Sequence, residues 1–372
     1  MNRSSIQEGA EGRLRELDGW RAISVLLVIV HHVFSWQHPE VFSSHGRLFH
    51  LFRYCGPLGV KVFFVISGFV ICRLLLQEEK RYGNVSLGAF YIRRAFRILP
   101  PLYFYLSIIL LLTSLGLVVS PLPTMLSSAL FLQDLRIWVP HDWFVGHTWS
   151  LATEEQFYLV FPTLWIISRK ISRVPFFLIL FSLVVAWNVS DAISSWDPIM
   201  GFAARPGFAC ICFGVIMAIL EPQARAIAKR VPMVTVISLM FVLLWSPMEG
   251  APLSTALYDT LFVPPAIGIV LMFSLERKGW LRSLLCSSPL QAIGVTSYGA
   301  YLWQELFTAL PRDLSVAAKP LSFLLPLLLV IVPLSWRFIE KPAMQLGKRL
   351  SKRLRARLPA EAAPSATEEA FA

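Results

Sequence analysis

Long runs of apolar residues recur along almost the whole chain, and they constrain its fold more than any other feature. A helix that crosses a bilayer needs roughly 20 mostly apolar residues. Because lipid offers no hydrogen bonds, the backbone of such a run must satisfy itself as a helix. We therefore predict an all-α fold, a polytopic transmembrane helical bundle of about ten spans. The predicted spans cover residues 18–36, 57–76, 98–118, 149–167, 174–191, 203–220, 231–248, 257–275, 289–310 and 320–340.

The composition agrees with a membrane protein that carries no sizeable soluble domain. The 372 residues are 56% hydrophobic and 15% charged, whereas a soluble chain averages about 25% charged residues. We predict three parts: a cytoplasmic N-terminal segment over 1–17, a transmembrane domain over 18–345, and a cytoplasmic tail over 346–372. The tail is basic and amphipathic at first and then disordered, with its basic part on the membrane surface. The first segment is polar, so we expect no cleavable signal peptide.

Basic residues are distributed unevenly between the predicted loops. If the N-terminus is cytoplasmic, most of the 34 lysines and arginines fall in cytoplasmic segments. This is the bias that the positive-inside rule describes. It predicts an even number of spans, both termini in the cytoplasm, and a multi-pass protein of the inner (plasma) membrane. Topology and contact with the anionic lipid bilayer also account for the net charge of +11, so we predict no nucleic-acid partner.

Two further features are read from local composition. The five cysteines lie mostly in apolar runs and form no zinc-like CxxC pair. We therefore predict packing cysteines, with no metal site and no disulfide framework. The apolar stretch 125–132 is too short to span a bilayer, and we expect a re-entrant or interfacial helix there.

The first predicted span carries two ionisable side chains, which are costly in lipid and are functional candidates by default. Arg21 lies near its cytoplasmic start, and His32 follows about 16 Å further along a helix that rises 1.5 Å per residue. Eleven residues make about three turns, so both side chains face nearly the same way. The alternative is positional: Arg21 snorkels to the interface and His32 makes a helix–helix hydrogen bond.

A second polar cluster runs from His147 to Tyr158 and opens the fourth predicted span. It contains the adjacent carboxylates Glu154 and Glu155, which the dipole near a helix N-terminus would favour. Successive helical positions diverge by about 100°, so we expect only one of them to face a site. That carboxylate, assigned to Glu154, would orient or stabilise a catalytic histidine, as the acid of a triad does.

A third cluster precedes the third span, where Arg94 and Arg97 share a helix face. Ordinary positive-inside charge explains this spacing by itself, whereas the functional interpretation is an anion clamp, because guanidinium groups bind phosphate well. Lys61 and Arg205 lie at the outer ends of spans. Each is either a snorkelling side chain or a contact to a substrate.

These clusters, taken with three other stretches, resemble the membrane acyltransferase-3 family of sugar O-acyltransferases over roughly residues 13–345. Each stretch alone is a weak signal, and six in the family's order make a strong one. The matching stretches are LDGWR at 17–21 followed by His32, GVKVFFVISGF at 59–69, Arg94-x-x-Arg97 with Leu99-Pro100, Trp149 to Tyr158, SYGAYLW at 297–303, and RFIEKP at 337–342.

The resemblance implies an acyltransferase that moves an acyl group, most commonly acetyl, from acetyl-CoA or another acyl-CoA. The donor is a co-substrate used on the cytoplasmic side, and no bound cofactor is expected. The acceptor would be a hydroxyl of a cell-surface polysaccharide, such as an exopolysaccharide or a lipopolysaccharide, or of a lipid-linked sugar. Acceptor identity, acyl group and oligomeric state stay open.

The resemblance and the polar clusters described above together assign roles to residues. The family's arginine-x10-histidine motif falls on Arg21 and His32, so His32 is the candidate general base, with Glu154 as its support. Arg94, Arg97 and Arg21 would bind the phosphates of CoA. Contacts to the acceptor are assigned to Lys61, Trp149, Ser150, Tyr158, Arg205, Tyr301 and Trp303.

One departure and two rival functions qualify this prediction. Gln304 stands where many relatives carry a histidine; if that histidine contacts the acceptor, acceptor identity cannot be carried over. A transient acyl-histidine is an alternative to direct transfer. The rival class is a transporter of a lipid-linked sugar or small solute, with buried His and Glu as a proton relay. The Arg94 and Arg97 pair favours a CoA phosphate, and a non-enzymatic scaffold would leave the buried charges without a role.

Overall fold

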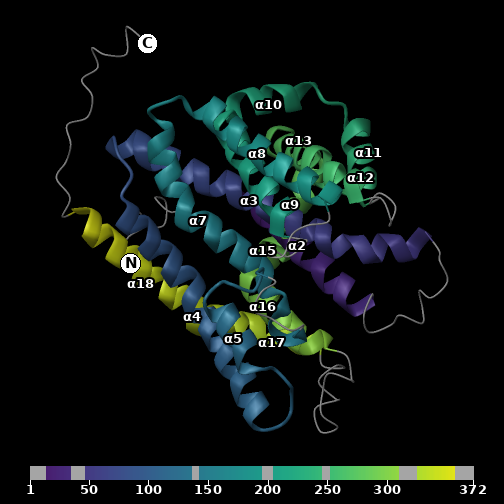
Figure 1. The fold of residues 1–372 in the computed structure, drawn as a ribbon, viewed down its shortest axis with the longest axis vertical. Helices are drawn as coiled ribbons and strands as arrows, with labels where there is room; N and C mark the ends of the chain where they lie inside the picture. The colour runs from purple at the N-terminus through teal and green to yellow at the C-terminus, as the bar shows by residue number, and fades with distance from the viewer. Residues whose placement is uncertain are drawn as a thin grey trace.

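The computed structural model describes residues 14–34, 47–135, 142–194, 204–244, 252–309 and 325–356. These residues form helices joined by turns, and no strand occurs among them, which confirms the all-α prediction. Figure 1 shows α8 to α13 gathered on one side of the molecule and α4, α5 and α16 to α18 on the other. The first two described helices pass between these groups.

The α-helices begin and end as follows, in chain order: α2 (Arg15–His32), α3 (Arg47–Tyr82), α4 (Leu87–Ser114), α5 (Leu122–Ala129), α6 (Trp143–Gly146), α7 (Thr148–Ser168), α8 (Arg173–Ser194), α9 (Ala204–Ile219), α10 (Glu221–Arg230), α11 (Met233–Leu244), α12 (Pro252–Leu257), α13 (Val263–Glu276), α14 (Trp280–Leu285), α15 (Ser288–Val295), α16 (Ser297–Thr308), α17 (Leu328–Ser335) and α18 (Lys341–Ala356). Three short stretches of other helix types adjoin them: η3 (Tyr258–Phe262), η5 (Leu325–Leu327) and η6 (Trp336–Glu340).

Every predicted span contains a helix or a run of short helices. Four described helices are long and apolar enough to cross a membrane by themselves, and a fifth crossing results if α9 and α10, bent by 91°, form one broken span. The count of ten and the orientation of the termini therefore stay predictions. Helices α2 and α7 are long but hold charged residues, and those residues belong to the candidate site. The four long helices are Tyr54–Tyr82, Leu87–Ser114, Arg173–Ile193 and Leu253–Glu276.

Two hydrophobic cores flank the first helix. One joins α3, α9 and α13, and the other joins α4, α16 and α17. Leu17, Trp20 and Val28 of α2 belong to the first core, whereas Val25 belongs to the second. Because α2 contributes buried side chains to both cores, it is held between the two halves of the molecule.

Close helix crossings fix the position of α3 against α9. A Cβ on Gly68 would strike the backbone carbonyl of Ile211, and a Cβ on Gly214 would strike the carbonyl of Val65. Small residues at helix contacts are how membrane helices gain packing without a hydrophobic driving force. Cys210 and Cys212, on the same helix, are buried, as are Cys55 and Cys72, which agrees with the predicted packing role.

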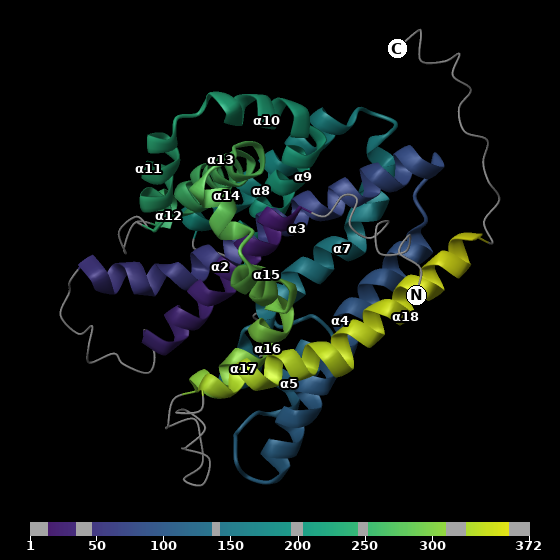
Figure 2. The ribbon, with the colours of Figure 1, turned by 180° about the vertical axis from the view of Figure 1, so that it is seen from behind.

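The C-terminal helix lies along α4, as both ribbon views show (Figures 1 and 2). Gly347 allows the approach, because a Cβ there would lie 2.6 Å from Cβ of Phe96. Near the far end Arg355 forms an ion pair with Glu78 and donates to the backbone carbonyl of Asn84 at 2.9 Å. The basic helix is therefore anchored to the bundle through one face. Its predicted location at the membrane surface stays a prediction, and 357–372 lie outside the described residues.

Candidate active site

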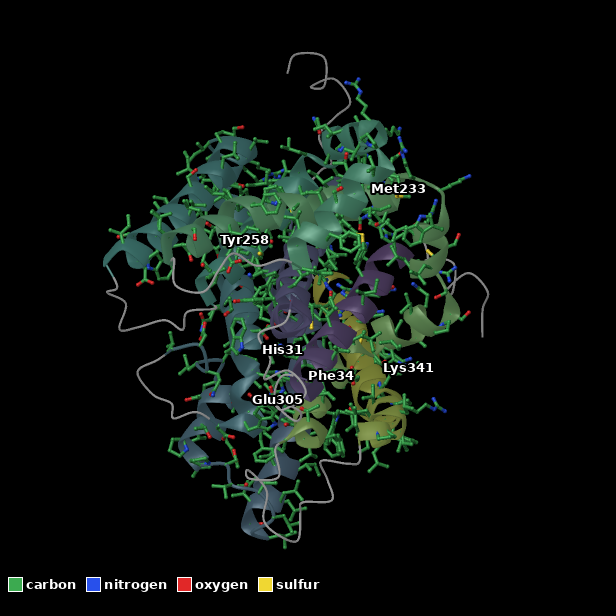
Figure 3. All side chains as sticks on the ribbon, turned by 90° about the vertical axis from the view of Figure 1, so that its right-hand side faces the viewer. His31, Phe34, Met233, Tyr258, Glu305 and Lys341 are labelled. Atoms are coloured by element: carbon green, nitrogen blue, oxygen red, sulfur yellow. The ribbon has the colours of Figure 1, made fainter. Side chains whose placement is uncertain are left out.

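A cavity of about 450 Å³ lies beside the end of α2, and we call it the histidine cavity. Its lining includes polar groups from helices that are far apart in sequence and aromatic rings from α6 and α7. The residues used below are His32, Lys61, Trp143, Trp149 and Glu305. His31 also lines it, and Figure 3 shows His31 and Glu305 in the middle of the molecule.

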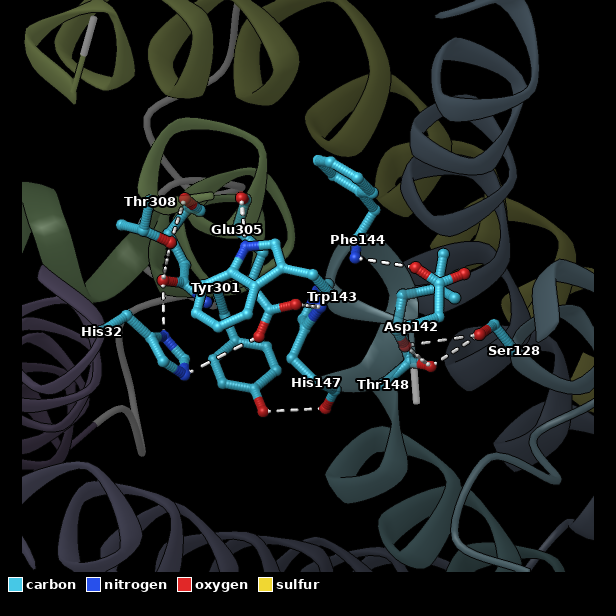
Figure 4. A network of polar contacts seen from close by, with 12 residues as sticks. His32, Ser128, Asp142, Trp143, Phe144, His147, Thr148, Tyr301, Glu305 and Thr308 are labelled. Atoms are coloured by element: carbon cyan, nitrogen blue, oxygen red, sulfur yellow. Dashed lines mark hydrogen bonds and ion pairs between the residues drawn. The ribbon is translucent and has the colours of Figure 1, made fainter. Parts of the chain in front are cut away.

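His32 occupies the last turn of α2, and both of its ring nitrogens meet α16 (Figure 4). Its Nδ1 lies 2.8 Å from Oε1 of Gln304, at hydrogen-bonding distance. Its Nε2 lies 3.7 Å from Oε1 of Glu305. The Trp143 ring packs edge-on against the imidazole, with 5.6 Å between the ring centroids. The imidazole is therefore held by an amide on one nitrogen and faced by a carboxylate on the other.

A second imidazole shares the same carboxylate. Nδ1 of His147 lies 2.8 Å from Oε2 of Glu305, and the His147 side chain is almost fully buried. The Tyr105 and Tyr301 rings pack edge-on against it, with ring centroids 5.8 Å and 5.3 Å away. Glu305 thus lies between His32 and His147, with one oxygen directed to each, as Figure 4 shows.

Sequence reasoning missed Glu305, although a signal for it was present. It is the one charged residue of the predicted span 289–310, and a lone carboxylate in such a span is a functional candidate by default. Gln304 was noted as a departure that bears on the acceptor. In the structure its side chain contacts His32, so this departure bears on the candidate base.

A smaller cavity of about 120 Å³, which we call the arginine cavity, lies next to the histidine cavity. Glu154 lines it and accepts hydrogen bonds from Ser67 Oγ at 2.7 Å, Tyr158 OH at 2.6 Å and Arg94 Nη2 at 3.0 Å. The Arg94 guanidinium also stacks on the Tyr158 ring, 3.5 Å from its centroid. Together these contacts satisfy a buried charge pair in the way that such pairs require.

One sequence prediction about Glu154 meets a different geometry. No contact among the described residues joins Glu154 to His32; the carboxylate that faces this histidine is Glu305. Of the two adjacent carboxylates, Glu154 lines the arginine cavity and Glu155 lines none of the three cavities described here. Arg94 lies 3.0 Å from Glu154 and 3.7 Å from Glu155, because a long guanidinium side chain reaches between neighbouring helical positions.

The two other predicted phosphate ligands share the arginine cavity with Arg94 and also line a second cavity, which Arg94 does not line. Arg21 and Arg97 line the arginine cavity and also a larger cavity of about 550 Å³, which we call the vestibule. Arg21 forms an ion pair with Asp18 at 3.2 Å, whereas Arg97 has no ion-pair partner among the described residues. Arg94 and Arg97 both lie within α4. This helix begins at Leu87, so it starts before the predicted span 98–118.

The three cavities are contiguous. The vestibule and the arginine cavity share Arg21, Arg97 and Tyr298. The arginine cavity and the histidine cavity share Phe64 and Tyr301. The three cavities therefore lie in a row, each sharing lining residues with the next, with the basic vestibule at one end and the cavity of His32 at the other.

Most of the predicted acceptor contacts do lie at these cavities. Lys61 and Trp149 line the histidine cavity, and Lys61 forms an ion pair with Asp259 at 2.5 Å. Ser150 lines the arginine cavity, and its hydroxyl lies 2.6 Å from that of Tyr301. The Tyr301 hydroxyl also donates to the backbone carbonyl of His147 at 3.0 Å. Tyr301 is therefore fixed at the boundary between the two cavities.

The three remaining predicted acceptor contacts, Tyr158, Trp303 and Arg205, lie in different places. Tyr158 lines the arginine cavity together with Arg94, whereas His32 lines the histidine cavity. Trp303 lines none of the three cavities; it is buried and packs against Tyr105, with 5.3 Å between ring centroids. Arg205 lies in the first turn of α9, and its side chain is outside the described part of the structure.

The last two matching stretches, SYGAYLW and RFIEKP, meet in space. A Cβ on Gly299 would lie 2.5 Å from Oε1 of Glu340, so only glycine leaves room for this buried carboxylate. Glu340 lines the vestibule beside Arg97 and Tyr298. Residues that are separate in the sequence thus form one wall of the vestibule.

Comparison with known proteins gives a consistent family match. The acyltransferase-3 family, described as an acyltransferase domain, matches residues 14–340. The chain is 25% identical to the peptidoglycan O-acetyltransferase OatA of Listeria monocytogenes, over 89% of this chain and 56% of that protein. It is 25% identical to the putative peptidoglycan O-acetyltransferase YrhL of Bacillus subtilis, over 90% of this chain and 55% of that protein.

A putative O-acetyltransferase of Staphylococcus aureus is 27% identical, over 89% of this chain and 57% of that protein. The chain therefore spans about half the length of these curated relatives. No solved structure matches it.

Proposed function

The chain belongs to the acyltransferase-3 family, and from that premise we propose that it is an O-acyltransferase of the inner membrane. It transfers an acyl group, most simply acetyl, from acyl-CoA to a hydroxyl of a cell-surface glycan or lipid-linked sugar. The observation that carries this proposal is the row of three cavities, with a cluster of cations at one end and His32 at the other. Such a row lets two substrates meet without sharing one opening.

The donor takes the vestibule side. Arg97 and Arg21 attract the phosphates of acyl-CoA, because guanidinium groups bind phosphate with paired, charge-assisted hydrogen bonds. The narrow pantetheine arm then fits the smaller arginine cavity and brings the thioester to the boundary at Tyr301. Arg94, already engaged by Glu154 and Glu155, holds the wall of that cavity. Its role is positioning.

The acceptor takes the histidine cavity, where His32 is the general base. Nε2 removes the proton of the acceptor hydroxyl as the oxygen attacks the thioester carbonyl, and the proton then passes to the departing CoA sulfur. The contact with Gln304 holds Nδ1, and the Glu305 carboxylate stabilises the imidazolium form. In this scheme Glu305 takes the supporting role that was assigned to Glu154.

A glycan acceptor agrees with the walls of the histidine cavity and with the relatives. Trp143 and Trp149 offer aromatic surface, while Lys61 and Asp259 offer charged hydrogen-bonding groups. A pocket with apolar walls and a few placed polar groups is typical of small-ligand sites. Relatives of this chain are named peptidoglycan O-acetyltransferases, so peptidoglycan is the first acceptor to test.

The test is acyl transfer by the purified chain with His32 replaced. We expect His32→Ala to abolish transfer from radiolabelled acetyl-CoA to a glycan while membrane expression and thermal melting stay near those of the parent chain. The neighbouring His31→Ala is the matched control and should lose far less. Near-normal acylation by His32→Ala would remove His32 from the chemistry. Mass spectrometry of surface glycans from a deletion strain would then identify acceptor and acyl group together.

A transporter is the second candidate, and one observation favours it. The series His32, Glu305 and His147 has the form of a proton relay. Consumption of acetyl-CoA by the purified chain separates the two functions, because a transporter leaves the thioester intact. Proteoliposomes that take up solute without consuming acetyl-CoA would support the transporter.

A further inference from the structure

The vestibule is lined by cations from four different segments. They are Arg21, Arg73, Arg97, Lys341 and Lys348. Arg73 forms an ion pair with Glu221 at 3.4 Å, and Arg21 forms one with Asp18. Arg97, Lys341 and Lys348 have no ion-pair partner among the described residues. The cavity therefore presents more positive charge than its own carboxylates neutralise.

The two lysines come from α18; Lys341 belongs to the matching stretch RFIEKP, and Lys348 lies beyond it. Lys341 and Lys348 are seven residues apart, about two turns, so they share one face of the helix. Met344 and Gln345, between them, line the same cavity. The close approach of Gly347 to α4 and the ion pair of Arg355 with Glu78 of α3 hold this face in place. The lysines form a wall of the vestibule and are not part of a free tail.

We propose that α18 is the phosphate-binding wall of the donor site. Lys341 and Lys348 bind the phosphates at the nucleotide end of acyl-CoA, opposite Arg97, and Trp336 at the rim stacks on the adenine ring. This inference rests on the proposed function and adds Lys341, Lys348 and Trp336 to the contacts proposed there for the donor. Acyl-CoA carries a diphosphate and a separate 3′-phosphate remote from its thioester, which suits several cations spread over a cavity of about 550 Å³.

An anionic lipid headgroup presents the same phosphate chemistry to the same lysines. CoA and a lipid headgroup differ in two respects. CoA carries a 3′-phosphate that a lipid lacks. CoA contacts only the cations that line its cavity, whereas a charged bilayer attracts all nearby cations of the helix. Lys352 is the matched control: it lies one turn further along α18, is exposed, and lines none of the three cavities.

The experiment measures binding of CoA and of 3′-dephospho-CoA to the purified full chain by calorimetry in neutral detergent. We expect Lys341→Gln and Lys348→Gln each to weaken CoA binding about tenfold, the loss of one charge-assisted contact. Lys352→Gln should stay within about twofold, since it removes only long-range attraction. One of the two lysines is expected to contact the 3′-phosphate. Replacing that lysine should not weaken the binding of 3′-dephospho-CoA, because the group that it contacts is absent from this ligand; the comparison is a double-mutant cycle.

Each result separates the inference from the proposed function. If CoA binds the parent chain and neither Lys341→Gln nor Lys348→Gln changes its affinity, the wall is not the donor site while the acyltransferase proposal stands. If the parent chain neither binds CoA nor consumes acetyl-CoA, the proposed function falls. If the variants lose only their thermal stabilisation by phosphatidylglycerol nanodiscs and keep CoA affinity, the ligand is a lipid headgroup, which also overturns the inference.

Discussion

The surroundings of two carboxylates of this site, the half-buried Glu154 and the buried Glu305, differ in whether their partners carry a permanent charge. Glu154 faces a permanent cation, Arg94, and accepts two further hydroxyl hydrogen bonds. Glu305 faces two imidazoles, His32 and His147, whose charge depends on protonation. A guanidinium stays charged, so the first arrangement is fixed, whereas an imidazole exchanges protons near neutral pH. The carboxylate with a permanently charged partner, Glu154, thus lines the arginine cavity, and the carboxylate with imidazole partners, Glu305, lines the histidine cavity.

The largest expected effect comes from neutralising the carboxylate that faces the imidazoles. Glu305→Gln should lower kcat by about a hundredfold or more, because the imidazolium of His32 loses the charge that stabilises it. KM for acetyl-CoA should stay nearly unchanged, since Glu305 does not line the vestibule. Steady-state kinetics of the purified variant measure both constants. A rise in KM with unchanged kcat would place Glu305 in substrate binding.

Removing the permanent cation should act on stability first. Arg94→Gln leaves Glu154 and Glu155 without their shared partner, which we expect to cost about 3 kcal/mol of unfolding free energy. Denaturant titration in detergent micelles measures this loss. Arg97→Gln, one turn along the same helix and without an ion-pair partner among the described residues, is the matched control. Equal losses in the two variants would contradict the structural role of Arg94.

Removing the amide of Gln304, which lies at Nδ1 of His32, should lower kcat less than neutralising Glu305. Gln304→Leu removes the group next to Nδ1, and we expect kcat to fall about tenfold through the loss of one hydrogen bond. Gln304→His, which installs the residue that many relatives carry, should retain more activity than the leucine variant because an imidazole can also hydrogen-bond to Nδ1. Parallel assays of both variants at equal expression decide the point.

The smallest expected effect concerns the hydroxyl that supports Glu154. Tyr158→Phe removes one of its three hydrogen bonds and keeps the ring that stacks on Arg94. We expect a loss of about 1 kcal/mol in unfolding free energy and a kcat within about twofold of the parent value, since Tyr158 lies away from His32. A large fall in kcat at normal stability would show that the arginine cavity takes part in the chemistry.

Several features could be predicted because they depend on local sequence. Apolar runs long enough to span a bilayer determine the helices, and every predicted span contains one. Charged side chains are costly in lipid, so Arg21 and His32 could be identified as functional candidates before their contact residues were known. Helix boundaries were predicted less well, because polar residues packed inside a bundle continue a helix past its apolar part, as at the start of α4.

The sequence by itself determined that this protein is a helical membrane protein with polar side chains concentrated in a few of its spans. Only the tertiary structure decided which of those side chains meet. Gln304 contacts His32 across 272 positions of the chain, and no helical periodicity within one segment reports such a pairing. The carboxylate beside the histidine is therefore Glu305 of α16, because helix packing brings that residue, and not Glu154, to the end of α2.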